Sequence, residues 1–308
     1  MIAVLSVTLP VFVIVALGFA STRLEWTNSA DIRSLGAFVI RFALPALIFK
    51  SLSQRSFTDI ARADFLAVYT LASLAAFGVM FALARALRPG RIDASAIQAL
   101  GSSASNSGFV GYPIALLFVG PSASLALALA MITENVVVIP LALTIAESAN
   151  HKGAKPLAVA GHLAGRLALN PLIVAIALGA AASISGLTLP QPLAKSVDML
   201  AAASGALALF AVGGALVGLQ VGGVASDVAR IVSGKLLLHP LLVFGALRFA
   251  PGLDPGLRKA MLILASSPML SIYPLLGRPF GQERVGAAAL MTATALSFVT
   301  ISALLIAL

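Results

Sequence analysis

This sequence is built from long apolar runs that are separated by short seams of Pro, Gly or charged residues. A hydrocarbon layer of about 30 Å takes roughly 20 apolar residues in helical form, because lipid offers the backbone no hydrogen bonds. Only 10% of the 308 residues are charged, too few to cover the surface of a soluble fold. We therefore expect an all-α, multi-pass membrane protein. Its ten membrane spans are expected over residues 2–20, 34–52, 63–87, 96–119, 122–146, 157–183, 193–219, 227–249, 257–276 and 285–308.

The charged residues lie mostly in the seams between these runs. The formal net charge is +9, but no single basic stripe forms, so the Lys and Arg side chains are expected to anchor the chain at the membrane surface rather than to bind nucleic acid. The first run lacks a basic start and is expected to be a span rather than a signal peptide. The loops after odd-numbered spans carry ten Lys and Arg against seven on the other side, which favours both termini outside the cytoplasm.

A repeat with a constant offset divides the chain into two halves. The run from Pro10 to Gly18 resembles the run from Pro171 to Gly179, and Tyr112-Pro113 matches Tyr273-Pro274. Both offsets are 161, since 171 minus 10 and 274 minus 113 give the same number. We expect one five-helix repeat over residues 1–150 and a second over 151–308. Because five is an odd number, the second repeat must enter the membrane from the opposite side, and such inverted repeats are typical of secondary transporters.

The fourth and ninth spans are interrupted by small polar residues, Gly and Pro, over 102–113 and 265–274. Lipid does not tolerate a broken backbone ladder unless the break lines a cavity in the protein. Paired interruptions at corresponding positions of inverted halves indicate a substrate site, where the ends of half-helices suit a carboxylate. The simpler alternative is that Gly and Ser permit close packing and Pro only kinks the helix.

Glu134 and Asn135 lie near the middle of the fifth span. A carboxylate at the centre of a bilayer costs about 2.5 to 3.5 kcal/mol on insertion scales, so it needs a partner, a proton or an aqueous cavity. The position related by the repeat is Ala295, so the fold does not require a carboxylate there. Glu134 is expected to bind a cation or exchange a proton, and the alternative is a structural hydrogen bond or ion pair inside the bundle, for example with Arg41.

Lys235 and His239 stand four residues apart in the eighth span and therefore share one helix face. They are candidates for holding positive charge or relaying a proton. The alternative is that Lys235 extends to the membrane surface. The sequence has no cysteine and no motif for phosphate binding, metalloproteolysis or a serine nucleophile, so we expect neither an enzyme nor a metal or organic cofactor.

The run from Asn106 to Pro113 resembles the Asn-Thr-Gly-Phe-x-Gly-x-Pro signature of the auxin efflux carrier family, with Ser107 in place of Thr. Asn170 to Ile173, Leu9-Pro10 and Arg41 to Pro45 are similar to the same family, and the similarity extends over essentially the whole chain. The family includes bacterial carriers, some assigned to malonate, and plant auxin exporters.

The resemblance implies a scaffold of spans 1, 2, 6 and 7 and a moving transport unit of spans 3 to 5 and 8 to 10, with spans 4 and 9 crossing at their breaks. It also implies that Asn106 lies at the crossing and that Asn135 contacts the substrate. The residues expected to bind the substrate are Asn106, Ser107, Gly108, Asn135, Pro268, Met269 and Ser271. Those expected to serve the coupling ion or proton are Glu134, Ser105, Lys235 and His239, and those expected to shape the breaks are Gly111, Pro113 and Pro274.

These features together predict a carrier of a small organic anion in the bacterial cytoplasmic membrane, working by alternating access. The expected partners are that anion, the bilayer and, optionally, a second copy of the chain in a homodimer; the coupling ion is sodium or a proton. One alternative is a sodium-coupled symporter like the distantly related bile acid carriers. The other is a membrane sensor that binds an anion without moving it.

Overall fold

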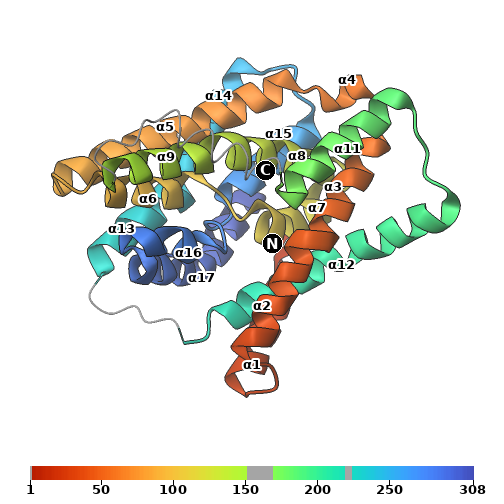
Figure 1. Cartoon of the computed structure of the whole chain (residues 1–308). Helices are drawn as coiled ribbons and strands as arrows, with labels where there is room; N and C mark the ends of the chain where they lie inside the picture. The colour runs from red at the N-terminus through yellow and green to blue at the C-terminus, as the bar shows by residue number, and fades with distance from the viewer. Residues whose placement is uncertain (1, 151–168, 219–223) are drawn as a thin grey trace.

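The computed structural model describes residues 2–150, 169–218 and 224–308 (Figure 1). Within these ranges all the regular secondary structure is helical. The elements up to residue 150 are α1 (Ile2–Arg23), α2 (Ser29–Phe38), η1 (Val39–Ala43), α3 (Leu44–Ser53), α4 (Phe57–Ile60), α5 (Ala63–Leu87), α6 (Ile92–Ser103), η2 (Ser107–Gly111), α7 (Tyr112–Val119), α8 (Ser122–Ile132), η3 (Thr133–Val138) and α9 (Ile139–Asn150).

The elements after residue 168 are α11 (Pro171–Ser185), α12 (Gln191–Ala215), α13 (Ala225–Ser233), η4 (Gly234–Leu238), α14 (His239–Ala246), η5 (Leu247–Phe249), α15 (Pro255–Ser266), α16 (Tyr273–Gly277), η6 (Arg278–Phe280) and α17 (Glu283–Ala307). Each of the ten expected spans contains at least one of these helices. The beginning of the sixth, residues 157–168, and the end of the seventh, residue 219, lie outside the described residues.

Six helical stretches of the described chain are long and apolar enough to cross a membrane. Three shorter apolar helices, Thr8–Arg23, Ser107–Val119 and Pro171–Ser185, accompany them. The six long stretches are Ser29–Ser53, Ala63–Leu87, Ser122–Ala149, Gln191–Ala215, Ala225–Phe249 and Glu283–Ala307. A helical, multi-pass protein is therefore confirmed, whereas the number of ten spans and the inverted relation of the halves stay predictions.

The second expected span begins earlier than the sequence suggested, at Ser29 rather than at residue 34. Asn28 caps this helix, because its side chain accepts hydrogen bonds from the backbone N–H groups of Ala30 and Asp31 at 2.7 and 3.1 Å. The Asp31 carboxylate accepts a bond from the Asn28 backbone at 2.8 Å. This reciprocal capping box holds the start of α2 in polar surroundings, ahead of the apolar run.

The helices form two groups that lie side by side (Figure 1). One group holds α1, α2, α3, α11 and α12, and the other holds α5, α6, α9, α13, α14, α16 and α17, with α7, α8 and α15 between them. The contact of α1 with α12 depends on glycine. A Cβ atom at Gly213 would lie 1.9 Å from the Val15 carbonyl oxygen, and one at Gly18 would lie 2.1 Å from that of Phe210. These two helices therefore touch backbone to backbone.

The helices of the fourth and ninth segments are both broken, and the two breaks meet. After α6 the chain is extended at Ala104, and after α15 it is extended at Ser267. Ser105 and Met269 pair as an isolated antiparallel bridge, and the Asn106 backbone N–H donates to the Pro268 carbonyl at 2.7 Å. Two segments far apart in the sequence thus satisfy each other's backbone where each helix is interrupted.

Candidate functional site: a cavity beside the crossing

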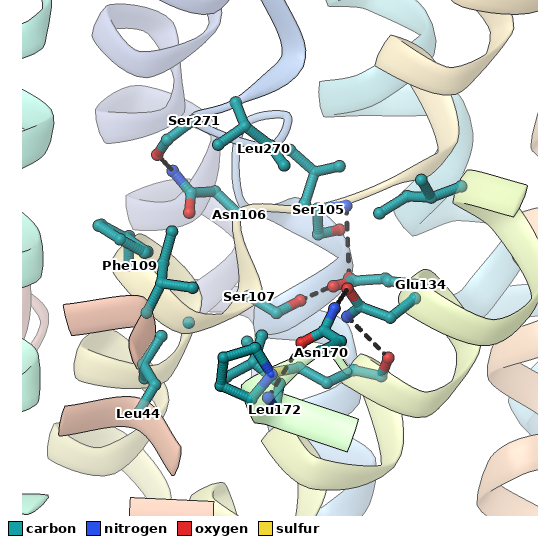
Figure 2. Close-up of a pocket in the computed structure, with 17 residues that line it drawn as sticks. Leu44, Ser105, Asn106, Ser107, Phe109, Glu134, Asn170, Leu172, Leu270 and Ser271 are labelled. Atoms are coloured by element: carbon teal, nitrogen blue, oxygen red, sulfur yellow. Dashed lines mark hydrogen bonds between the residues drawn. The ribbon is translucent and has the colours of Figure 1, made fainter. Parts of the chain in front are cut away.

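A cavity of about 290 Å³ lies beside this crossing (Figure 2). Its wall combines aliphatic and aromatic side chains with three Asn residues, three Ser residues and one carboxylate. One side is formed by residues 105–109, Met131, Glu134, Asn135, Ile139 and residues 270–272, and the other by Ile40, Leu44, Asn170, Pro171 and Leu172. The cavity therefore lies between the two helix groups and takes residues from both.

Asn106 joins the two broken segments at the end of the cavity where they cross. It is 3% exposed, and its amide Nδ2 donates to the Ser271 hydroxyl at 2.7 Å. Val110 and Gly111 donate their backbone N–H groups to the Asn106 carbonyl, so the half-helix of η2 and α7 starts here. The N–H groups of residues 107–109 precede these first helical bonds, and they lie at the positive end of the helix dipole.

Glycine allows the crossing to be this compact. A Cβ atom at Gly108 would lie 2.8 Å from terminal carbon atoms of both Leu44 and Met131. At Gly111 it would lie 2.7 Å from the Ser267 hydroxyl and 2.8 Å from a methyl carbon of Leu264. Glycine at both positions therefore lets η2 approach its neighbours, which side chains at either position would prevent.

Glu134 is buried at the wall of the cavity, with 1% of its surface exposed. Its Oε1 atom accepts hydrogen bonds from the Ser107 hydroxyl at 2.6 Å, the Tyr69 hydroxyl at 3.2 Å and the Ser105 backbone N–H at 3.3 Å. The suggested ion pair with Arg41 is wrong, because Arg41 is exposed and the carboxylate is satisfied by these neutral donors instead. Glu134 and the residues of the break form one polar cluster.

Lys235 and His239 are buried on one face of the eighth segment, as their spacing predicts. The Lys235 ammonium donates to the Ala265 carbonyl at 2.5 Å, near the end of α15, and lies 3.0 Å from Nδ1 of His239. Nε2 of His239 lies 2.9 Å from the Ser73 hydroxyl. With Lys235 charged, its ammonium can only donate, and that assignment makes Nδ1 the acceptor and puts the imidazole proton on Nε2, facing Ser73.

The alternative in which Lys235 extends to the membrane surface is wrong, because the whole side chain is enclosed. Its charge lies at the C-terminal end of α15, where the helix dipole is negative and a cation is stabilised. Lys235 and His239 are not among the residues that line the cavity, so they lie behind the crossing rather than in it.

The remaining predicted residues fall into two sets. Pro268 and Met269 belong to the paired backbone of the crossing and do not line the cavity. Pro274 lies in the first turn of α16, where a missing N–H removes no helical hydrogen bond, so it begins the second half of that broken helix. Pro113 instead lies within the half-helix that starts at Asn106, directly after the π-helical turn η2, whose wider spacing accommodates the missing N–H.

Three polar residues of the site were not identified from the sequence. Tyr69 and Ser73 reach the cluster from α5, and their spacing of four residues on an apolar helix is the signal that could have indicated a shared polar face. Asn170 lines the cavity from the start of α11, and its Nδ2 lies 3.5 Å from Oδ1 of Asn135. Asn135 in turn donates to the Met131 carbonyl at 2.9 Å.

Among the described residues, no group of three or more His, Asp or Glu side chains is placed to hold a metal ion. The oxygen atoms near Glu134 are hydroxyl and carboxylate oxygens, and the nitrogen donors are mostly amides. Such a site can hold an anion through amide and backbone N–H groups or exchange a proton at the carboxylate.

Comparison with known proteins decides the family. The model of the membrane transport protein family matches residues 3–306. The chain belongs to this family, the auxin efflux carriers. The resemblance of the Asn106 to Pro113 run is thereby confirmed, and the chain is a membrane transporter of this family.

Two relatives add detail. The chain is 32% identical over 307 residues to a protein named "Putative malonate transporter" from Rhizobium meliloti (strain 1021), across 99% of this chain and 96% of that protein. It is 25% identical over 237 residues to the "Uncharacterized transporter YfdV" of Escherichia coli (strain K12), across 76% of this chain and 74% of that protein.

Proposed function

We propose that this auxin efflux carrier family member is a secondary carrier that moves a small organic anion across the bacterial cytoplasmic membrane by alternating access. The substrate class is a carboxylate, such as malonate or an auxin-like acid. The observation that carries the proposal is the cavity beside two broken helices whose breaks pair at Ser105 and Met269. The malonate assignment in the name of one relative supports the same substrate class.

Asn106 is the proposed centre of the anion site. Its amide donates to Ser271, and both side chains line the cavity, so a carboxylate can take the amide hydrogen in competition with the serine oxygen. The backbone N–H groups at the start of η2 face the same region, and the positive end of a half-helix favours an anion. A substrate bound at the crossing would contact the paired backbone that joins the two broken helices, so its binding could affect both helices at once.

The proposed architecture has ten spans in two inverted five-helix repeats, residues 1–150 and 151–308. The scaffold consists of α1 to α3, α11 and α12, and the transport unit consists of α5 to α9 and α13 to α17. Both termini are proposed to lie on the periplasmic side. This division is supported by the placement of the cavity, whose two walls come from different helix groups.

Glu134 is the proposed coupling group. Its buried carboxylate contacts Ser105 and Ser107 at the break, so a change of its charge would act directly on the crossing. Proton exchange is the first candidate. Sodium is the second, because the oxygen atoms of Glu134, Ser107, Ser105 and Tyr69 converge within hydrogen-bond distance of one another. Lys235 and the neutral imidazole of His239 complete the set of titratable groups behind the crossing.

The test is counterflow of labelled malonate and of labelled indole acetate in proteoliposomes that contain the purified chain. Unlabelled substrate inside the vesicles should drive uptake of label. Replacement Asn106→Ala should remove most of it, because a hydrogen bond to a charged group contributes about 1.5 to 3 kcal/mol. Binding without any counterflow would instead support an anion sensor, and neither binding nor counterflow for a panel of mono- and dicarboxylates would overturn the proposal.

The coupling ion is tested by imposing sodium and pH gradients separately on the same vesicles. If transport is coupled to protons, the rate of uptake should change with the pH gradient and should not change with the sodium gradient. Stimulation by sodium at constant pH would support the symporter alternative.

A further inference from the structure

We propose that Asn170 is a second substrate contact, supplied by the scaffold side of the cavity, and that it makes the carrier prefer dicarboxylates to monocarboxylates. The inference rests on the proposed function and deepens it, because it assigns a role to a residue on the opposite wall from Asn106.

The position of Asn170 is fixed by the helix that it begins. Its Oδ1 atom accepts the Leu172 backbone N–H at 2.9 Å, which makes it the N-cap of α11. Since Oδ1 is held by the helix, the other side of the amide, Nδ2, must point away from it. Nδ2 is directed at the cavity, where it meets Asn135 (Figure 2).

Among the residues that the structure describes, the amide hydrogen atoms of Asn170 have only one weak partner. The distance from Nδ2 to Oδ1 of Asn135 is 3.5 Å, at the outer limit of hydrogen bonding and longer than the 2.7 Å contact of Asn106 with Ser271. A carboxylate oxygen at this place would form a shorter, charge-assisted bond. Asn170 is therefore a donor that gains a better partner when an anion enters.

The two amides lie at different ends of the cavity. Figure 2 shows Asn106 with Ser271 at one end and Asn170 with Leu172 toward the other, with Ser107 and Glu134 between them. The described residues that line the cavity include no Lys, Arg or His, so the side-chain donors among them are amides and hydroxyls. A dicarboxylate carries an acceptor group at each end and can engage both amides, whereas a monocarboxylate engages one and leaves the other without a charged partner.

Glu134 opposes this placement only when it is ionised. The hydrogen bonds that its Oε1 atom receives from Ser107, Tyr69 and Ser105 stabilise the group without removing a charge, so a dianion enters most readily when Glu134 is protonated, as the proposed proton exchange allows. Asn135, the next residue in the sequence, lies beside Asn170, and its Oδ1 atom faces Nδ2 of Asn170. When the anion takes the Nδ2 hydrogen, Asn135 loses only the weak contact.

The chain offers substitutions that separate binding from folding. Asn, Asp and Ser cap helices about equally well, so Asn170→Ser and Asn170→Asp keep the cap of α11. Serine removes the amide donor, and aspartate replaces it with a negative charge. Asn28 caps α2 in the same way but does not line the cavity, so Asn28→Ser is the matched control.

The experiment measures binding of malonate and of propionate, which has the same number of carbon atoms but one carboxylate, to the purified full chain and its variants. The unmodified chain should bind malonate more tightly than propionate. Asn170→Ser should lower the affinity for malonate about 10-fold and leave that for propionate unchanged, since one hydrogen bond to a charged group is lost. Asn170→Asp should lower malonate affinity further, and Asn28→Ser should match the unmodified chain.

Two results would overturn the inference while leaving the proposed function intact. One is malonate affinity in Asn170→Ser equal to that of the unmodified chain. The other is an equal loss for malonate and propionate, which would mean a general effect on the site. If the unmodified chain bound neither acid nor any other carboxylate, the proposed function itself would fail, and the assignment of Asn170 with it.

Discussion

At the scale of single residues, the sequence shows where buried charge lies but not what satisfies it. Glu134 and Lys235 are conspicuous because a charged residue within an apolar run is costly. Their partners come from other segments: Tyr69 lies 65 positions before Glu134, and Ala265 lies 30 positions after Lys235. Such contacts depend on how the helices pack. The sequence therefore suggested Arg41 as an ion-pair partner for Glu134 and did not identify the hydroxyl groups that bind it.

The role of Glu134 is tested by Glu134→Gln. The amide has nearly the same shape and can still accept the bonds from Ser107 and Tyr69, but it can neither carry charge nor release a proton. We expect the variant to fold, to bind malonate and to lose the dependence of uptake on a pH gradient, measured as initial rates in proteoliposomes. Glu25→Gln, at an exposed position, is the control. Uptake by Glu134→Gln that follows pH and sodium as before would remove Glu134 from coupling.

Replacement of Lys235 tests whether its charge holds the end of α15. In Lys235→Met the Ala265 carbonyl loses its donor, and Nδ1 of His239 loses its neighbour. We expect a loss of about 1 to 3 kcal/mol in unfolding free energy, because a buried acceptor is left unsatisfied. The stabilities of the variant and of the unmodified chain are compared by thermal unfolding, monitored by circular dichroism. Lys195→Met, at an exposed site on α12, should change stability by no more than about 0.5 kcal/mol. Equal stability of the two variants would contradict this role.

At the scale of elements, the sequence analysis identified the interruptions but not the π-helical turns. Small residues and proline over 102–113 and 265–274 indicated both breaks, because lipid-facing helices rarely carry such clusters. The π-helical turns η2, η3 and η4 contain Ser107, Glu134 and Lys235, respectively. Each of these turns ends two residues before a proline, namely Pro113, Pro140 and Pro240, whose missing N–H and ring favour a local widening of the helix, so these prolines are the signal that could have indicated the turns.

The packing of α1 on α12 gives a prediction at this scale. Gly213→Ala would place a methyl group 1.9 Å from the Val15 carbonyl oxygen, so the two backbones must separate. Overpacking of this kind costs about 1 to 3 kcal/mol. Gly78→Ala in α5 meets nothing within 4 Å and should instead gain about 0.5 to 1 kcal/mol from helix propensity. Opposite shifts of the thermal midpoint are expected, and a shift in the same direction for both variants would contradict the close contact.

At the scale of the whole molecule, the sequence accounted for the helical class and the family, and the resemblance supplied the division into scaffold and transport unit. What the sequence could not supply is the seam between them, because its contacts join residues that no local pattern relates. Ser51 of α3 donates to Ser124 of α8 at 2.9 Å across this seam, and Arg55 donates to the Pro121 carbonyl at 3.0 Å. If the two helix groups move relative to each other during transport, these bonds must break in every cycle.

A disulfide across the seam tests that movement, and the chain suits the test because it contains no cysteine. Hydroxyl oxygens 2.9 Å apart place the Cβ atoms of Ser51 and Ser124 near the separation that a disulfide requires, about 3.5 to 4.5 Å. We expect oxidised Ser51→Cys/Ser124→Cys to bind malonate but to lose counterflow, and reduction to restore it. The control pair is Ser21→Cys/Thr27→Cys, whose hydroxyls lie 3.1 Å apart within the scaffold, so its disulfide should leave counterflow unchanged. Full counterflow through the oxidised Ser51→Cys/Ser124→Cys pair would mean that the substrate crosses without relative movement of the two helix groups at this point, and alternating access between them would have to be abandoned.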